Sequence, residues 1–105
     1  MSLSHSTDGL SAELHSTYDM VRAAFPAGIP DENYRAALLL LAENMSQRQL
    51  ARLMAYCTGR DYYRVYNDVL AVLSGQPAYQ PPDEQVAEVR RRLQQHGYDH
   101  WLTEE

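Results

Sequence analysis

The sequence predicts an all-α protein, a compact bundle of about five short helices. Three observations predict this fold class: apolar residues recur three and four positions apart in several segments, clusters of Pro and Gly separate those segments, and no segment has a partner strand. The chain has 105 residues, which is the usual size of one domain. We expect residues 1–10 to form a flexible N-terminal arm and residues 11–105 to form a single helical-bundle domain.

The first two helices are predicted on either side of a turn rich in Pro and Gly. An apolar stripe predicts a helix with Asp8 or Ser11 as its N-cap, and the stripe consists of Leu10, Leu14, Tyr18, Val21 and Phe25. The turn Pro26–Pro30 ends this helix, and Gly28 supplies a residue that can adopt a positive φ. Asp31 is the expected N-cap of a second helix over residues 31–43. Because its middle is apolar on every side, we expect this helix to be central.

Capping residues define the third and fourth helices. Ser46 and Gln49 form a capping box at the start of the third helix, with Met45 and Leu50 as a hydrophobic staple. Gly59 ends this helix, and its expected inner face consists of Leu50, Leu53, Met54 and Cys57. Asp61 is the expected cap of a fourth helix over residues 62–73. The expected inner positions of that helix are Tyr62, Val65, Tyr66, Val69, Leu70 and Leu73.

An extended connector and a fifth helix complete the expected fold. Residues 76–82 are rich in Pro and predict an extended connector. The last helix starts near Pro82, ends at residue 95 or 96 before Gly97, and has Val86, Val89 and Leu93 as its inner stripe. We expect Tyr98 and Trp101 to fold back and close the bottom of the core.

Charge and cysteine content limit the classes of function. Fourteen acidic residues against nine basic residues give a net charge of -5, the wrong sign for a general binder of nucleic acids or anionic membranes. Cys57 is the single cysteine, so an intramolecular disulfide is excluded. The first ten residues lack a basic residue, and the longest apolar run, residues 36–42, is too short to span a bilayer. We expect a cytoplasmic protein without membrane contact.

No catalytic, cofactor-binding or metal-binding residue is predicted. His96, Asp99 and His100 are possible metal ligands, but Gly97 interrupts the helix that would align the imidazoles, so surface histidines are the favoured interpretation. The sequence contains none of the Ser, Cys or His motifs of nucleophilic or zinc catalysis and no Gly-rich phosphate loop. Cys57 is interpreted as an inert core residue. We therefore expect a protein that is not an enzyme.

Two surfaces are candidates for partner binding. The chain has eight Tyr against one Phe and one Trp, and Tyr is enriched at interfaces. The favoured hypothesis is a module for protein contacts, whose expected partner surface consists of Tyr62, Tyr63, Tyr66, Arg60 and Arg64. Alternatively, these tyrosines are half-buried residues at the edge of the core, with no binding role. The partner itself is not predicted.

The alternative function is a helix-turn-helix DNA-binding protein that uses residues 35–57. Its recognition face would consist of Gln47, Arg48, Gln49 and Arg52, because these residue types read guanine and adenine edges. Arg48 and Arg52 share an outward face of the third helix, nearly opposite Leu50. The acidic net charge counts against this hypothesis, because phosphate contacts would be weak.

Two motifs resemble a known family. The turn Phe25-Pro26-Ala27-Gly28-Ile29-Pro30 precedes a Leu-rich helix, and Val86-Ala87-Glu88-Val89-Arg90-Arg91-Arg92-Leu93 leads to Gly97-Tyr98. This pattern resembles the actinobacterial domain of unknown function numbered 3349, found mainly in mycobacteria and rhodococci. The resemblance covers about residues 13–102 and implies a monomeric five-helix bundle without an established activity, cofactor or catalytic residue. The segment Tyr62–Tyr66 departs most from the pattern within the bundle.

Overall fold

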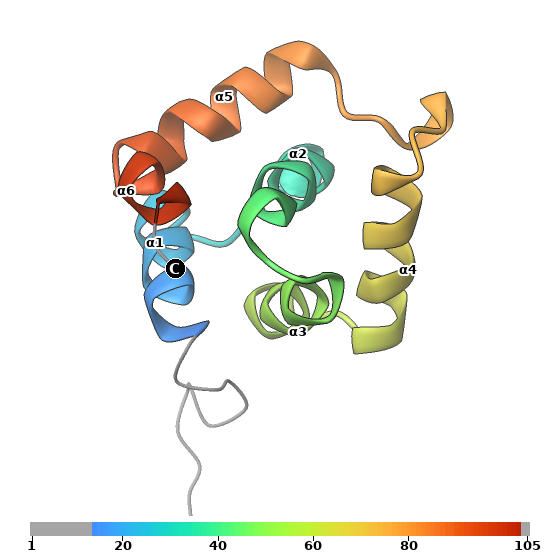
Figure 1. Cartoon of the computed structure of the whole chain (residues 1–105), viewed down its shortest axis with the longest axis horizontal. Helices are drawn as coiled ribbons and strands as arrows, with labels where there is room; N and C mark the ends of the chain where they lie inside the picture. Colours follow the sequence, from blue (N-terminus) through green and yellow to red (C-terminus); the bar gives the residue numbers. More distant parts are fainter. Residues whose placement is uncertain (1–13, 104–105) are drawn as a thin grey trace, which may run out of the picture.

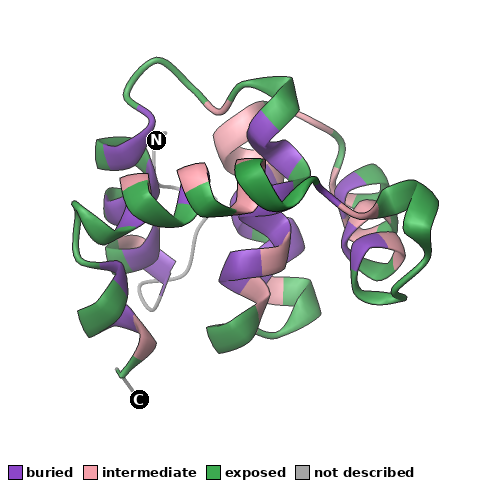
Figure 2. Cartoon of the chain, turned by 90° about the horizontal axis from the view of Figure 1, so that it is seen from above, coloured by how far each residue is buried: buried purple, intermediate pink, exposed green. Residues whose placement is uncertain are grey.

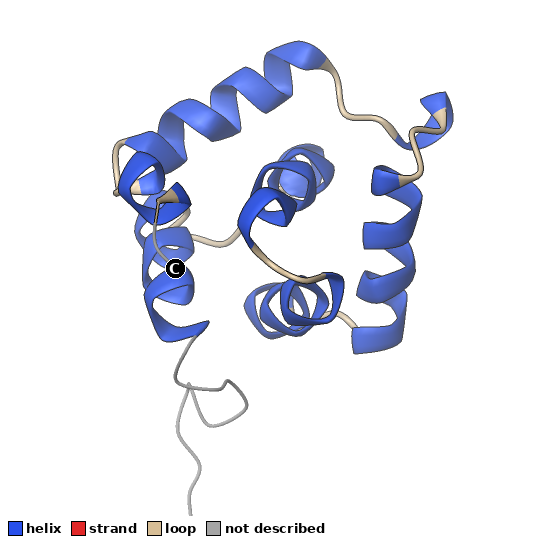
Figure 3. Cartoon of the chain, viewed as in Figure 1, coloured by secondary structure: helices blue, strands red, loops and turns tan. Residues whose placement is uncertain are grey.

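The structure, a computed structural model, describes residues 14–103, and the observed helices confirm the all-α prediction. The predicted arm and the positions Asp8, Leu10 and Ser11 lie outside the described residues. Figure 3 shows helices joined by loops and no strand within the described part of the chain. The helices are α1 (His15–Ala24), α2 (Asp31–Leu41), α3 (Gln47–Thr58), α4 (Tyr62–Leu73), α5 (Asp83–Gln94) and α6 (Tyr98–Leu102), with 3-10 turns at Ala42–Asn44 and Pro77–Tyr79.

Helix α2 is the central element, as its apolar sequence predicts. In Figure 1 it lies in the middle of the molecule, with α5 above it, α4 to its right, α3 below it and α1 to its left. Its inner side chains are almost completely buried, and they are Ala36, Ala37, Leu38, Leu40 and Leu41. Figure 2 shows that buried positions of the surrounding helices face the middle of the bundle, while their outer surfaces are exposed. The apolar middle of α2 is stable here because neighbouring helices cover most of it, with Leu39 left half-buried.

In the turn before α2, Gly28 has the predicted positive φ, but the N-cap residue of α2 differs from the prediction. Gly28 has a φ of 100°, a conformation that side-chain-bearing residues rarely adopt. Asp31 is the first residue of α2 and its side chain caps nothing; Pro30 occupies the N-cap position. The reason is that the Pro30 carbonyl already accepts a bond from the Asn33 N–H at 2.9 Å, so the helix begins one residue earlier than predicted. The helix also ends at Leu41, where a 3-10 turn replaces the last predicted residues.

Both predicted caps of α3 and α4 are confirmed. The Gln49 backbone N–H donates to Ser46 Oγ at 3.1 Å, and the Ser46 N–H donates to Gln49 Oε1 at 3.4 Å. At α4 the Arg64 N–H donates to Asp61 Oδ2 at 3.2 Å. Gly59 ends α3, as predicted. The two helices are therefore fixed at both sides of the short loop that joins them.

The buried face of α4 differs from the prediction. Val65 and Val69 are buried, as predicted, and Val72 is buried with them. Leu70 and Leu73 were predicted to lie inside but are 39% and 41% exposed. The two leucines follow the same spacing of three and four as the core, but on a stripe rotated by about a quarter-turn from the valines. Both stripes fit the periodicity, so the helical spacing by itself could not select the buried one.

Helix α6 closes the bundle as predicted. After Gly97, whose φ is 98°, the chain reverses and buries Tyr98 and Trp101. The Trp101 indole N–H donates to Thr17 Oγ1 at 2.7 Å, and the Tyr98 hydroxyl donates to the Leu40 carbonyl at 3.3 Å. The C-terminal helix is thereby attached to both α1 and α2.

The connector between α4 and α5 is less extended than predicted. Residues Pro77–Tyr79 form a 3-10 turn, and Gln80 Nε2 donates to the Val72 carbonyl at 2.8 Å. Helix α5 ends at Gln94, one residue before the predicted range. Within it, Val89 and Leu93 are buried and Val86 is half-buried, which confirms the predicted inner stripe.

Candidate functional site

A groove between α3 and α4 brings together residues from both predicted surfaces. It has a volume of about 640 Å³ and is lined by Arg48, Arg52 and Ala55 of α3 and by Tyr62, Tyr63 and Tyr66 of α4. On α3 the lining positions are four and three residues apart, which places them on one side of that helix. We call this feature the α3–α4 groove. Its volume is within the range of typical small-ligand pockets, about 300–1,000 Å³.

The tyrosines of the α3–α4 groove form an aromatic cluster. The Tyr62 and Tyr66 rings are stacked, with centroids 6.1 Å apart and an interplanar angle of 14°. Tyr63 meets Tyr62 edge-on at 5.1 Å, and 73% of the Tyr63 residue is exposed. None of the three hydroxyls has a hydrogen-bond partner among residues 14–103. The cluster therefore offers both apolar ring faces and tyrosine hydroxyl groups to a ligand.

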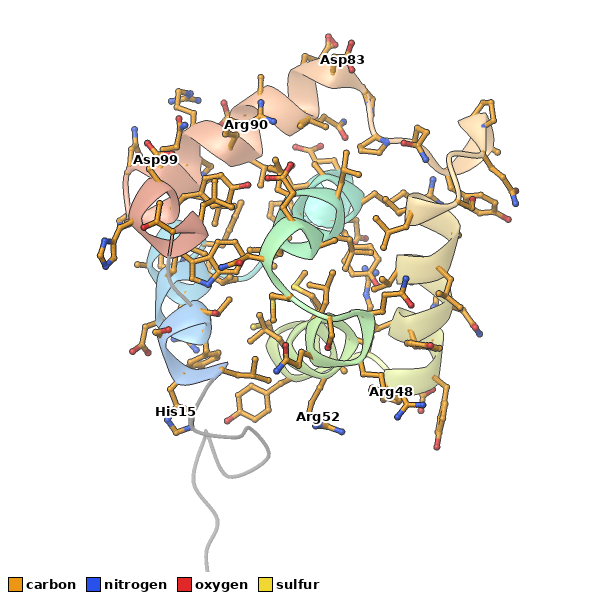
Figure 4. All side chains as sticks on the ribbon, viewed as in Figure 1. His15, Arg48, Arg52, Asp83, Arg90 and Asp99 are labelled. Carbon is orange, nitrogen blue, oxygen red and sulfur yellow. The ribbon has the colours of Figure 1, made fainter. Side chains whose placement is uncertain are left out.

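Arg48 and Arg52 provide the positive charge of the groove. They are one helical turn apart, and Figure 4 shows both side chains on the outer side of α3, away from α2. Within the described part of the chain neither guanidinium has a hydrogen bond or an ion pair, and no carboxylate lines the groove. A positive, donor-rich groove thus lies on a protein whose net charge is -5.

A second cleft, of about 370 Å³, lies on the opposite side of α4. Arg60 and Arg64 line it with Tyr34 of α2 and Asp68 of α4. The Tyr34 hydroxyl donates to Asp68 Oδ2 at 2.8 Å, and burial followed by the Asp68 carboxylate raises the Tyr34 pKa to about 12. Since Tyr34 belongs to α2 and Asp68 to α4, this hydrogen bond connects the two helices.

Arg60 is held within the second cleft. Its Nη2 lies 2.7 Å from Asp31 Oδ1, and its guanidinium carbon lies 3.9 Å from the centre of the Tyr34 ring. The exposure of Asp31 limits the energy of this ion pair, whereas the ring contact fixes the position of the guanidinium. Arg60 therefore supports the packing of α2 against α3 and α4.

The predicted partner surface is divided by α4. Tyr62, Tyr63 and Tyr66 line the α3–α4 groove, whereas Arg60 and Arg64 line the second cleft. The cause is helical geometry, because Arg64 points 100° or more away from each of these tyrosines around the α4 axis. In place of Arg60 and Arg64, the arginines beside the tyrosines are Arg48 and Arg52.

The predicted DNA-recognition face is also divided. Arg48 and Arg52 are exposed in the groove, but the Gln49 side chain accepts the capping-box bond from Ser46 and Gln47 does not line the groove. Helix α3 packs mainly against α4 and only slightly against α2. The predicted recognition residues are therefore not presented together by a tightly packed pair of α2 and α3, which weighs against residues 35–57 as a DNA-binding unit.

The remaining chemistry-bearing residues lie apart from the groove. Cys57 is half-buried, and desolvation raises its pKa to about 11, which suppresses its thiolate. Among residues 14–103 no group of three or more His, Cys, Asp and Glu side chains is placed to hold a metal ion. His96 and His100 are both exposed.

Sequence reasoning missed two features of the site. The contact between Tyr34 and Asp68 joins residues 34 positions apart, and no spacing rule connects them. The exposed side of α4 was assigned to the core. The valines at positions 65, 69 and 72 were an available signal for the buried side of α4, because valines at helical spacing can form a packed face as well as leucines do.

Comparison with known proteins identifies the family. The family model described as "Protein of unknown function (DUF3349)" matches residues 13–101, which include every residue of the α3–α4 groove. The chain belongs to the DUF3349 family. Neither the curated proteins nor the solved structures gave a match. The DUF3349 description names no activity, so the assignment of functional residues in this DUF3349 protein rests on geometry.

No helix within residues 14–103 of the DUF3349 protein has the length and apolar character needed to cross a bilayer.

Proposed function

We propose that this DUF3349 protein is a protein-interaction module without catalytic activity, and that the α3–α4 groove is its binding site. The observation that carries the proposal is the groove itself, where two arginines without partners in residues 14–103 meet three clustered tyrosines. Arg and Tyr are enriched among the residues that dominate binding energy at protein interfaces. None of the six lining residues is a His, Cys, Asp or Glu that could serve as a general base.

The proposal includes the setting in which the module works. Its resemblance to an actinobacterial family supports an actinobacterial host, and a single cysteine without a disulfide partner supports a reducing cytoplasm. We propose that the protein acts as a monomer, so that the groove is accessible to a different protein.

A quantitative capture experiment tests the binding site. The tagged full-length chain and its variants are incubated with cytoplasmic extract of the host, and captured proteins are quantified by mass spectrometry. The double variant Tyr62→Ala/Tyr63→Ala should bind at least one partner about thirtyfold more weakly, because an aromatic anchor at an interface is worth about 2 kcal/mol. Tyr79→Ala is the matched control, since Tyr79 is an exposed tyrosine outside the groove.

Two single arginine variants test which side of α4 binds the partner. Arg52→Ala removes a groove charge, whereas Arg64→Ala removes an exposed charge of the second cleft. Only Arg52→Ala should reduce capture. Equal capture by the wild type and every groove variant, with all variants folded by circular dichroism, would show that the groove is not the binding site.

The helix-turn-helix alternative has less structural support. Gln47 and Gln49 do not lie in the groove with the arginines, and α3, which would be the recognition helix, packs most extensively against α4 and only slightly against α2. A DNA-binding protein would bind duplex DNA with an affinity that falls steeply as salt increases and that requires Arg48 and Arg52. We expect no such binding at moderate salt.

A further inference from the structure

The surface of α4 continues the groove as an exposed apolar stripe. Tyr63, Tyr66, Leu70 and Leu73 are separated by three, four and three residues, so they lie on one side of the helix. We call these four residues the α4 outer stripe. Three of them are among the exposed large hydrophobic residues of the described chain, at 73%, 39% and 41% for Tyr63, Leu70 and Leu73. A spacing of three and four is the pattern that a packed partner helix requires.

Positive charge borders one end of the α4 outer stripe. Tyr63 and Tyr66 line the groove together with Arg48 and Arg52, so the stripe passes from a charged end to an apolar end. The two guanidiniums lack carboxylate partners within residues 14–103 and are four residues apart. Two carboxylates one helical turn apart on a partner would match that spacing.

The size and charge of the surface favour a short protein segment over a nucleic acid. A strand of DNA or RNA extends its phosphates beyond two arginines, and the protein as a whole has a net charge of -5. A peptide helix can instead place two carboxylates at the arginines and present apolar side chains to the stripe. Repulsion from the remaining acidic surface is screened beyond about 8 Å at physiological salt.

A second copy of this chain fits the surface less well. The α4 outer stripe of another copy contains no acidic residue, so Arg48 and Arg52 would stay unpaired. The acidic residues of the α4 region are already engaged, because Asp61 accepts the bond that caps the helix and Asp68 accepts the Tyr34 hydroxyl. Self-association would therefore bury the stripe without neutralising the arginines.

We propose that the α3–α4 groove and the α4 outer stripe bind an amphipathic helix of another protein, with two carboxylates facing Arg48 and Arg52 and apolar side chains facing Leu70 and Leu73. This inference rests on the proposed function and specifies the chemistry of the partner.

Designed peptides test the inference with the full-length protein. One synthetic helix of about 18 residues has Leu at spacings of three and four and two Glu residues one turn apart beside the Leu face. A second peptide replaces both Glu with Gln. Fluorescence anisotropy should show the Glu peptide binding about tenfold more tightly than the Gln peptide, with a difference that shrinks as salt rises.

Protein variants locate the binding. Arg48→Gln/Arg52→Gln should abolish the difference between the two peptides, and Leu70→Ser/Leu73→Ser should weaken both peptides equally. Arg64→Gln, on the other side of α4, is the matched control and should change neither affinity. All four side chains that are changed in the two double variants are exposed, so the urea midpoints of these variants should stay near that of the wild type.

The outcomes separate this inference from the proposed function. If neither peptide binds but groove variants still lose a captured protein, the helical acidic partner is wrong and the interaction module stands. Equal affinity for both peptides overturns the role of the arginines. Tighter groove-dependent binding of a short single-stranded or duplex DNA overturns both proposals. A dimer in sedimentation analysis that Leu70→Ser/Leu73→Ser dissociates assigns the stripe to a second copy and overturns the inference.

Discussion

Arginines of identical chemistry have opposite roles on the two sides of α4. Arg60 is held by Asp31 and by the Tyr34 ring, whereas Arg52 faces the α3–α4 groove without an ion-pair partner in the described chain. The partners of Arg60 are 29 and 26 residues away in sequence. Local sequence therefore indicates that an arginine is charged and exposed. Whether it has an ion-pair or ring partner depends on residues that are distant in sequence.

Cys57 should react slowly with thiol reagents in the folded protein. Burial raises its pKa from 9.0 to about 11, so below pH 9 the thiolate is about a hundredfold less abundant than for an unperturbed thiol. The rate of reaction with a chromogenic disulfide, measured with and without denaturant, tests this expectation. Equal rates in the two conditions would contradict the assigned position of Cys57.

At the scale of single elements, α3 depends on its capping box. Ser46→Ala removes the oxygen that accepts the Gln49 N–H, and we expect the free energy of unfolding to fall by about 1 kcal/mol. Gln47→Ala is the control, because Gln47 is exposed and the substitution should change stability by at most about 0.5 kcal/mol. Urea unfolding followed by circular dichroism measures both. A similar loss in the two variants would show that the cap contributes nothing specific.

In α4, truncating the smaller side chain Val69 should destabilise the protein more than truncating the larger side chain Leu70. Val69 is fully buried and Leu70 is 39% exposed, so Val69→Ala should cost about 2 kcal/mol and Leu70→Ala less than about 1 kcal/mol. The deleted leucine atoms were already partly in water and leave no closed cavity. Urea midpoints of the two variants compare these costs directly. A larger cost for Leu70→Ala would show that Leu70 belongs to the core, as the sequence predicts.

For the molecule as a whole, α6 connects the two ends of the bundle. The indole N–H of Trp101 donates to Thr17, and these residues are 84 positions apart. Thr17→Val leaves that buried donor without its acceptor, so we expect a loss of about 1–3 kcal/mol in the free energy of unfolding. Adding Trp101→Phe should cost less in the Thr17→Val background than in the wild type. Additive losses in this double-mutant cycle would mean that the hydrogen bond contributes little.

The folded protein should lose stability at alkaline pH. Burial is the main cause that raises the pKa values of Tyr34 and Tyr98 from 10.0 to about 12, with Asp68 and Glu43 adding repulsion to the respective phenolates. Each phenol thus holds its proton more tightly when folded. The stability they contribute is complete below pH 10 and is lost as the pH rises through 12, and Cys57 adds a similar loss between pH 9 and 11.

A variant identifies the source of the alkaline loss. Tyr34→Phe should reduce the slope of stability against pH above pH 10, because it removes one of the two phenols whose pKa is raised by burial. Tyr63→Phe, a substitution at a tyrosine that is 73% exposed, is the matched control. Urea midpoints at several pH values measure the slope. An unchanged slope in Tyr34→Phe would show that this phenol ionises as readily in the folded protein as in the unfolded chain.

Local sequence patterns were enough to predict most of the turns and caps of this protein. The turn at Gly28, the capping box at Ser46, the cap at Asp61 and the return of Tyr98 and Trp101 all follow from local backbone chemistry or from apolar spacing, and all are confirmed. The central place of α2 was also predictable, because a helix that is apolar all round has no favourable position at a surface. Asp31 shows the limit at an element boundary, where Pro30 was an equally good start.

The contacts between residues of different helices depend on how the helices pack together. Two stripes of α4 satisfy the same helical period, and the packing of α4 against α2 and α3 selected the valine stripe for the core, leaving Leu70 and Leu73 outside. The same packing placed Tyr62 and Tyr66 beside Arg48 and Arg52 and put Arg60 and Arg64 across the helix. The physical reason is that periodicity fixes angles around one helix axis, whereas the rotation of each helix within the bundle depends on the combined burial of all its neighbours.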